Sequence, residues 1–420
     1  MKATLRNQRS RRRRRQQKQR QSRRQGQRQQ QQRFQQRGGA PQKFTVMTYN
    51  TEVYHRIFGK FLNKGPDGKV VDSPDIRGKL RSQQPLLSAY AAATGDAETI
   101  AKAALFESLF AGVDIACLQE DVLINLGAAG GGHQPFLKAV RDLPLSSICH
   151  SHDFSWDITK QLYGEGGRLA NSIYSKMRCL PNADSNELCG VFPEGHCAIS
   201  DTSNPTRRCY ASSLFEIGGK IIKVVSVHLS GGRFEDGKGI ISDYSAKEKQ
   251  RELMRLIDSF SCGKVIPDII CGDFNAKFPK GAVDPGHASD TYFQLLVNDL
   301  LKEEAGYARL ASVDPGQLTT YWNRYKTWTV ELFHYMCDYN KGLYKPAFGA
   351  GIRDTTMYGG TVDMIFYNDA TIAGVVDSAG RVFSTADTGR VDGTMVRNAA
   401  GKWDAYISDH APVKVTFQTR

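Results

Sequence analysis

Six strand-like segments of the sequence carry, at or next to one end, a side chain that can bind a metal ion or transfer a proton. Charged groups beside apolar strands are costly to bury unless they are paired or bound to a metal. Their recurrence at strand ends therefore indicates one shared site. The candidates are Asn50 after FTVMTY, Glu120 after CLQ, His228 within VVSVHL, Asp273 and Asn275 after DIIC, Asp363 at the start of DMIFY, and Asp409 with His410 before APVKV.

These residue types suit metal-assisted chemistry at a phosphate. Carboxylates and an amide can give a hard divalent cation such as Mg²⁺ its oxygen ligands, while waters fill the remaining positions. Two histidines near a cation suit proton transfer and contact with a phosphate oxygen. Taken singly, Asn50 could cap a turn, Asp273 could start one, and either histidine could be a bonded core residue. The six positions together favour a catalytic site.

Apolar runs predict the elements that must position these residues. Helices are predicted at Thr99–Phe110, Ala246–Phe260 and Asp290–Glu304. Many strands, few helices and no internal repeat predict one large α/β domain in which two sheets pack face to face. The predicted strands are 44–49, 113–119, 172–175, 213–217, 221–229, 268–274, 361–368 and 411–417.

The ordered motifs TYN, LQE, HL, GDFN, VDMIF and SDH resemble those of the endonuclease/exonuclease/phosphatase superfamily. They run from Asn50 to His410, and GDFN followed by SDH is the specific part of the signal. The resemblance implies a deoxyribonuclease-like two-sheet β-sandwich flanked by outer helices. It also implies a hydrolase of phosphoester bonds that depends on Mg²⁺, with Mn²⁺ as a substitute. Glu120 is then the principal metal ligand, helped by Asn50 and Asp409.

The same resemblance implies the catalytic roles. Asp273 would orient or deprotonate the attacking water, and Asn275 would position that water or a phosphate oxygen. Asp363 would hold His410 in the correct orientation, because a carboxylate beside an imidazole raises its basicity and fixes its tautomer. His410 and His228 would contact the scissile phosphate, stabilise its developing negative charge and donate a proton to the leaving oxygen.

The chain departs from the family pattern in its loops. The catalytic domain is expected over residues 44–420, with insertions near 55–98, 177–209 and 305–358. Asn171, in GRLANSIYSK, is a looser match to a family strand motif. Arg233, in SGGRFEDGKG, could clamp a phosphate through its guanidinium or be a solvated loop charge. The stretch TTYWNRYKTW could stack bases or be an amphipathic helix whose aromatic residues face the core.

The excess of positive over negative charge lies in residues 1–43, which precede the expected catalytic domain. The whole chain has 56 Lys and Arg against 43 Asp and Glu, a net charge of +13. Residues 1–37 alone hold 15 basic residues and no acidic one, so the rest of the chain carries a net charge of about −2. A segment of Arg and Gln cannot bury enough apolar surface to order itself, so we expect a disordered tail. It could bind nucleic acid without sequence preference, bind an anionic membrane surface, or only keep the protein soluble.

Location follows from the same tail and from the cysteines. Arg11–Arg15 could be a nuclear import signal, and a virion-packaged enzyme would carry a similar tail. No apolar core of a secretory signal follows the basic start, and no apolar run is long enough for a spanning helix. Nine cysteines favour a reducing compartment and an intracellular protein. Zinc, disulfides and free thiols all remain open for Cys179, Cys189, Cys197 and Cys209.

Three functions are consistent with these features. The first is a metal-dependent endonuclease or exonuclease that cleaves DNA or RNA, suggested by the site together with a polycationic tail. The second is a phosphoesterase acting on sphingomyelin or an inositol polyphosphate. The third is a non-catalytic nucleic-acid-binding protein that acts through its tail, which the complete motif set disfavours. The oligomeric state is left open.

Overall fold

The fold is described from a computed structural model of the chain. The residues described are 40–58, 63–64, 70–71, 87–125, 132–133, 145–151, 167–180, 190–191, 210–229, 266–278, 344–348, 355–356, 361–384, 386, 389–397, 399 and 403–420. The basic residues 1–37, the predicted helices at 246–260 and 290–304, Arg233 and the aromatic stretch 319–328 lie outside them.

The first sheet has nine strands and contains both parallel and antiparallel pairs. Its centre is β1, which pairs in parallel with β4 on one side and antiparallel with β19 on the other. In order across the sheet the strands are β16 (Val382–Phe383), β15 (Ile372–Val376), β19 (Val413–Thr419), β1 (Lys43–Asn50), β4 (Ile115–Asn125), β7 (Gly167–Ser175), β6 (Leu145–Ser151) and β9 (Gly190–Val191), with β5 (Gly132–His133) paired to β4.

The second sheet has six strands and is also mixed. Its central pair, β11 and β12, is parallel, whereas β12 and β14 are antiparallel. In order the strands are β13 (Tyr344–Pro346), β14 (Thr361–Asn368), β12 (Ile269–Phe278), β11 (Lys220–His228), β10 (Tyr210–Ile217) and β8 (Arg178–Leu180). Two small hairpins stand apart from both sheets: β2 (Asn63–Lys64) with β3 (Val70–Val71), and β17 (Met395–Arg397) with β18 (Trp403–Ala405).

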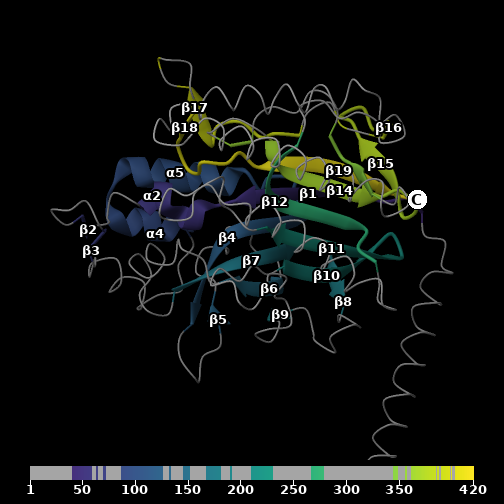
Figure 1. Cartoon of the computed structure of the whole chain (residues 1–420), viewed down its shortest axis with the longest axis horizontal. Coiled ribbons are helices and arrows are strands. Elements are labelled where there is room, and N and C mark those ends of the chain that lie inside the picture. Colours follow the sequence, from purple (N-terminus) through teal and green to yellow (C-terminus); the bar gives the residue numbers. More distant parts are fainter. Residues whose placement is uncertain are drawn as a thin grey trace, which may run out of the picture.

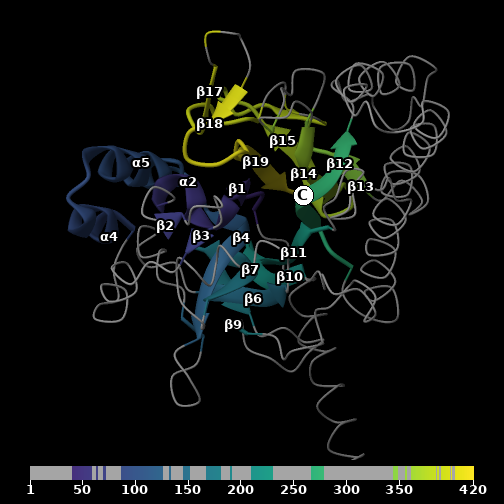
Figure 2. The same cartoon turned by 60° about the vertical axis from the view of Figure 1, so that its left-hand side comes forward.

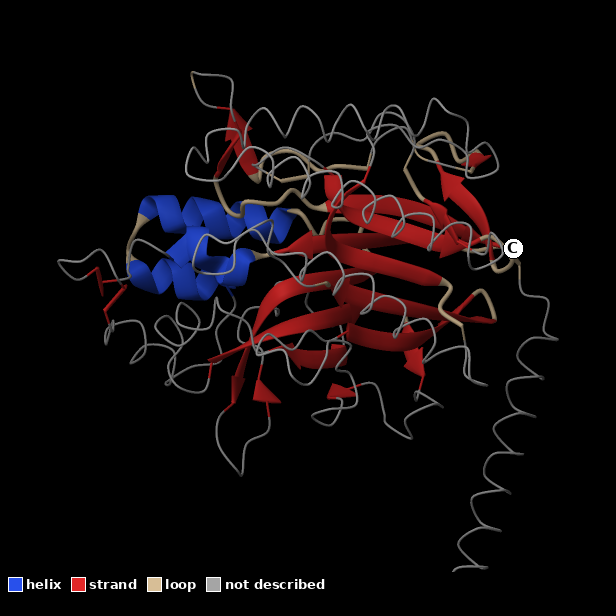
Figure 3. Cartoon of the chain, in the orientation of Figure 1, coloured by secondary structure: helices blue, strands red, loops and turns tan. Residues whose placement is uncertain are grey.

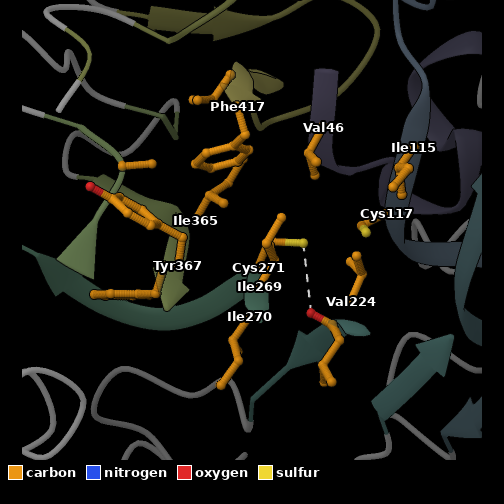
Figure 4. Close-up of a cluster of buried hydrophobic side chains, with 14 of the residues drawn as sticks. Val46, Ile115, Cys117, Val224, Ile269, Ile270, Cys271, Ile365, Tyr367 and Phe417 are labelled. Atoms are coloured by element: carbon orange, nitrogen blue, oxygen red, sulfur yellow. Dashed lines mark hydrogen bonds between the residues drawn. The ribbon is translucent and has the colours of Figure 1, made fainter. Parts of the chain in front are cut away.

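The main core lies between the two sheets (Figures 1 and 4). The first sheet contributes Val46, Ile115 and Phe417 to it, and the second contributes Val224 and Ile365, all fully or almost fully buried. The strand β14, TVDMIFYN, is buried along its whole length. Burial on both faces explains why its sequence is mostly apolar and does not alternate with polar residues. The predicted two-sheet sandwich is confirmed.

The helices of the described residues cover the outer face of the first sheet, at the side of β1 and β4 (Figures 2 and 3). A second apolar cluster joins Tyr49 and Leu118 of the sheet to Phe106 of α5. The Asp96 side chain begins α5 by accepting a hydrogen bond from the backbone N–H of Thr99 at 2.8 Å, a standard N-cap. The helical elements are η1 (Glu52–Tyr54), α2 (His55–Phe58), α4 (Leu87–Thr94) and α5 (Ala97–Ser108).

The predicted strands are present, and most run further than the sequence indicated. The strand expected at 113–119 continues as β4 to Asn125, and the one expected at 172–175 begins at Gly167. The helix α4 lies within the insertion at 55–98, where no helix was predicted. Its sequence, Leu-Ser-Ala-Tyr-Ala-Ala-Ala-Thr, has little of the amphipathic pattern by which a helix is recognised. Within the described residues, no helix is both long and apolar enough to cross a membrane.

The state of three cysteines is defined within the described residues. Cys117 and Cys271 are free thiols buried in the core between the sheets, as their apolar strands predict. Cys179, in β8, is disulfide-bonded, which supports the disulfide alternative for this cysteine. Cys189, Cys197 and Cys209 lie outside the described residues.

Candidate functional site

Three strands of the second sheet bring three of the predicted residues into one row. The parallel register of β11 and β12 sets His228 opposite Asp273, and the antiparallel register of β12 and β14 sets Asp273 opposite Asp363. Gly272 makes this close pairing possible. Its φ is +147°, and a Cβ at this position would lie 1.9 Å from the carbonyl oxygen of Val227. The glycine of GDFN is therefore required by the backbone.

The first sheet brings its own residues to the same place. Parallel pairing of β1 and β4 aligns Asn50 with Gln119, so that Glu120 follows directly at the end of the paired segment. In the pairing of β4 with β7, Leu118 is opposite Ser172 and Asp121 is opposite Ala170. Two residues of β4, Gln119 and Glu120, therefore face the single residue Asn171 of β7. This is a β-bulge, and it places Asn171 beside Glu120.

Side chains of the two sheets meet at Asp273. The Asn50 side-chain amide donates a hydrogen bond to Asp273 Oδ2 at 3.1 Å, and this bond crosses from one sheet to the other. His228 Nε2 lies 3.6 Å from the same Asp273 oxygen and 3.7 Å from Glu120 Oε1. Asp273 and His228 are buried, whereas the Glu120 side chain is 18% exposed. The row in the second sheet thus faces Asn50 and Glu120 of the first.

The segment before β19 adds a histidine to this group. His410 Nδ1 donates to Asp363 Oδ2 at 2.8 Å, which leaves Nε2 to face the centre of the site. Nε2 lies 3.8 Å from both Asp273 Oδ2 and Asp409 Oδ1. Ser408 holds this segment in place, because its hydroxyl donates to the Asn50 carbonyl at 2.7 Å and accepts from the His410 N–H at 3.1 Å.

Asn275 lies in the irregular part of β12 that follows Asp273, where the pairing with β14 shifts register. Its backbone N–H donates to Asp273 Oδ1 at 2.7 Å, and its side-chain amide donates to the Leu229 carbonyl at 3.0 Å. It adopts a left-handed conformation with φ +49°, which asparagine tolerates better than most residues. Asn275 therefore orients the Asp273 carboxylate and ties the ends of β11 and β12 together.

Burial makes two carboxylates of this group, Asp363 and Asp409, unusually weak acids. Burial raises the pKa of Asp363 to about 6, although the facing His410 ring opposes the shift. Burial also raises the pKa of Asp409. Burial alone would lower the pKa of His410, but Asp363, Asp409 and Asp273 outweigh it and raise that pKa well above its usual value. The site therefore stabilises positive charge.

The donor set fits a hard divalent cation. Carboxylate and amide oxygens converge here, and these are the ligands that Mg²⁺ prefers. Four carboxylates share the site with two imidazoles: Glu120, Asp273, Asp363 and Asp409 with His228 and His410. Ligand atoms of Asp273, Asp363 and His410 all lie within 4.8 Å of one another. Because His410 Nδ1 already bonds Asp363, this trio suits proton handling better than direct coordination.

Seven of the predicted residues form one continuous network of contacts, with Asn275 joined to it through Asp273. Asn171 is adjacent through the bulge, and Arg233 lies outside the described residues. Sequence reasoning missed Glu52, whose Oε2 accepts the Asp409 N–H at 3.2 Å. Burial would raise the pKa of Glu52, but hydrogen bonds from His55 and Arg56 outweigh it and the pKa is lowered. Its position two residues after Asn50 was the available signal.

Similarity to known proteins is found at the level of solved structures, and it is low but extends over most of the chain. No protein-family model matches the sequence, and no curated protein is significantly similar to it. The structure is similar to the human Nocturnin catalytic domain with bound sulfate, at 14% identity and a TM-score of 0.45, covering 90% of this chain and 95% of that one. It is also similar to two endonuclease/exonuclease/phosphatase family proteins. The protein from Leptotrichia buccalis is 9% identical, with a TM-score of 0.42, and the match covers 89% of this chain and 99% of that one. The protein from Bacteroides thetaiotaomicron is 12% identical, with a TM-score of 0.41, and the match covers 90% of this chain and 99% of that one.

Proposed function

We propose that the protein is a divalent-metal-dependent phosphodiesterase that hydrolyses DNA or RNA. The observation that carries the proposal is the junction at Asp273. There His410, which is bonded to Asp363, comes within 3.8 Å of the Asp273 carboxylate. Asn50 and His228 contact the same carboxylate, and Glu120 lies 3.7 Å from His228. A carboxylate-oriented imidazole beside clustered oxygen ligands suits hydrolysis of a phosphoester.

The metal would be held chiefly by Glu120, with Asn50 and Asp409 as further oxygen ligands. Mg²⁺ is the expected ion, and Mn²⁺ would replace it. When bound, the cation polarises a phosphoryl oxygen and offsets negative charge that develops on the phosphate. Glu120 suits this role because its side chain is the more exposed partner of the buried His228.

His410 would donate a proton from Nε2 to the leaving oxygen. Its Nδ1 is bonded to Asp363, so the tautomer and the ring direction are fixed, and the carboxylates of Asp363, Asp409 and Asp273 raise its pKa, which favours the protonated ring. His228 would contact a non-bridging phosphate oxygen. Asp273 would orient the attacking water and accept its proton, with its carboxylate held by Asn50 and by the Asn275 N–H.

Nucleic acid is proposed as the substrate because of the charge distribution in the sequence. The 15 basic residues of the first 37 suit a polyanion, and they would raise the local concentration of substrate near a globular part that is itself slightly acidic. Such an arm would affect capture and salt sensitivity more than the chemical step. Asn171 and Arg233 are proposed as further phosphate contacts.

A substrate panel tests this proposal. Full-length protein is incubated with single- and double-stranded DNA, RNA, sphingomyelin and an inositol polyphosphate, in Mg²⁺ and in EDTA. We expect nucleic acid to be cleaved in Mg²⁺ only, and cleavage to be lost in Asp273→Ala. The matched control is Asp114→Asn. Asp114 directly precedes β4, and its carboxylate accepts a hydrogen bond from the Thr45 N–H at 2.8 Å, away from the site.

Each result of the panel has a definite meaning. Cleavage by a folded Asp273→Ala protein, or equal cleavage in EDTA, contradicts the mechanism. Turnover of sphingomyelin or the inositol polyphosphate without cleavage of nucleic acid contradicts the substrate class and favours the other phosphoesterase function. Binding of nucleic acid without turnover of any substrate favours a binding protein.

A further inference from the structure

Glu120, the proposed principal metal ligand, stands at a strained point of the backbone. Its φ is +50°, in the left-handed region that residues with a side chain rarely adopt. It also lies in the bulge where Gln119 and Glu120 together face Asn171. Such a conformation costs about 1–3 kcal/mol and persists only where the surrounding structure holds it. The groups that hold the bulge therefore decide where the Glu120 carboxylate points.

Asp121, the next residue, is a buried carboxylate with four donors. Its Oδ2 accepts from the hydroxyls of Ser172 at 2.6 Å and Tyr174 at 2.7 Å. Its Oδ1 accepts from the hydroxyl of Tyr54 at 2.7 Å and from the Val122 N–H at 2.8 Å. Burying an aspartate is costly without such partners. The donors make one rotamer of Asp121 far more favourable than the others.

The partners of Asp121 come from the elements that carry the other ligands. Tyr54 lies in η1, which follows Asn50, and Ser172 directly follows Asn171 in β7. Thr51 closes the arrangement from the other side, because its hydroxyl donates to the Glu120 carbonyl at 2.7 Å. The bulge is thus bonded to β1, η1 and β7 at once.

Strain is concentrated in the same place. Glu52, Val53 and Tyr54 all have positive φ, between +48° and +58°, so the turn that presents the Tyr54 hydroxyl is itself held in an unfavourable conformation. The Tyr54 ring packs edge-on against Phe106 of α5, with centroids 5.3 Å apart. The hydroxyl that reaches Asp121 is therefore fixed by packing under the helices.

We propose that Asp121 is a positioning residue for the metal site: it holds the β4 bulge in the geometry that aims Glu120 at the metal, in register with Asn50 and Asn171. The inference rests on the proposed function, because it concerns the metal ligand named there. Asp121 touches neither substrate nor metal in this account. It acts through the backbone of Glu120 and through three hydroxyl groups.

Metal binding by the full-length protein tests this role without relying on turnover. Mn²⁺ is titrated calorimetrically into wild type, Asp121→Asn and the control Asp114→Asn, and thermal unfolding is recorded for each. We expect Asp121→Asn to weaken Mn²⁺ binding about 10- to 100-fold, the usual effect of losing a group that orients a metal ligand. Asp114→Asn, at the opposite end of β4, should bind Mn²⁺ as wild type does.

A gentler pair of variants decides the case if Asp121→Asn does not fold. Tyr174→Phe removes one hydroxyl that bonds Asp121, and Tyr344→Phe removes one that bonds the Pro267 carbonyl at 2.8 Å, far from the site. We expect weakened Mn²⁺ binding in the first and unchanged binding in the second. Equal binding in wild type, Asp121→Asn and Tyr174→Phe overturns the inference while the proposed function stands. Absence of Mn²⁺ binding by wild type overturns both.

Discussion

A buried aspartate stands at each end of the part of β12 that pairs with β11, and the surroundings of the two differ. At one end, Asp268 accepts a hydrogen bond from the Lys223 N–H at 2.6 Å and one from the Thr371 hydroxyl at 2.5 Å, and the charge of the buried Lys223 side chain lies nearby. At the other end, Asp273 lies among Asp363, Glu120 and two histidines. The first aspartate is compensated by this chain's own groups, and the second belongs to a group with an excess of acid.

The difference separates a structural carboxylate, Asp268, from Asp273, the one that we propose to be functional. At Asp268 the hydrogen bonds and the nearby Lys223 oppose the effect of burial, which still raises its pKa to about 6. At Asp363 and Asp409 burial also raises the pKa, His410 opposes the shift and the neighbouring Asp273 adds to it. A raised pKa therefore occurs at both ends, and the gathering of several such groups around one point is what indicates a functional site.

Backbone strain follows the same division. Among the described residues, those other than glycine that have positive φ all lie at or beside the functional end. No such residue flanks Asp268 within the described part of the chain. Strain of this kind persists where function requires a particular geometry. The residues are Glu52, Val53, Tyr54, Glu120 and Asn275.

The largest expected difference between the two ends is catalytic. His410→Ala removes the imidazole that Asp363 orients, and we expect the rate of phosphodiester cleavage to fall by about 10²- to 10⁴-fold, the usual contribution of an acid–base group. Asp268→Asn should leave the rate near that of wild type. The measurement is single-turnover cleavage of a nucleic-acid substrate in Mg²⁺, well below the unfolding temperature. A comparable loss in both variants would remove the distinction between the ends.

The next effect concerns stability and pH at the structural end. Burial raises the pKa of Asp268 to about 6 in the folded protein, whereas an unfolded aspartate titrates near 3.9. The folded state therefore holds a proton between these values that the unfolded state has lost. As pH rises from about 4 to 6, the free energy of unfolding should fall by about 2 kcal/mol more in wild type than in Asp268→Asn.

Chemical denaturation at a series of pH values measures this difference. Subtracting the Asp268→Asn curve from that of wild type cancels most other titrating groups. A difference that is flat between pH 4 and 6.5, or that rises with pH, would show that Asp268 is not held in the environment described.

A smaller effect is expected at Ser408, which links the functional end to β1. Ser408→Ala leaves the Asn50 carbonyl and the His410 N–H without a hydroxyl partner. We expect about 1–3 kcal/mol less stability in denaturant unfolding and about tenfold slower cleavage, because His410 loses its anchor. Ser175→Ala is the matched control. Its hydroxyl also donates to a backbone carbonyl, that of Asp114 at 3.1 Å, and accepts a backbone N–H, that of Met177 at 2.9 Å, but away from the site. It should lower stability with little change in rate.

The sequence predicted the two-sheet fold and the residues that meet at Asp273, because both depend on local patterns. Parallel pairing of β1 with β4 and of β11 with β12 brings strand ends to one edge, so motifs at strand ends had to converge. The role of Gly272 is also visible in GDFN once the approach of β11 is known.

Other features depend on contacts that no local pattern encodes. The Asp121 network joins residues 51 to 67 positions apart in the sequence, and the bulge at Glu120 appears only when β4 is paired with β7. Cys179 lies in β8, and the spacing of the cysteines that follow it left its state open. Glu52 lies next to a recognised motif, but its bond to Asp409 spans 357 positions.

Calorimetric titration of Mg²⁺ into full-length wild type, Glu120→Gln and Asp268→Asn shows whether Glu120 holds a metal ion. We expect a Mg²⁺ site in wild type that is lost or greatly weakened in Glu120→Gln and retained in Asp268→Asn. At a Mg²⁺ concentration 100 times the Kd, the ion should raise the free energy of unfolding of wild type by about 2.7 kcal/mol. Wild type that binds no Mg²⁺, or Glu120→Gln that binds it as tightly as wild type, would contradict the account.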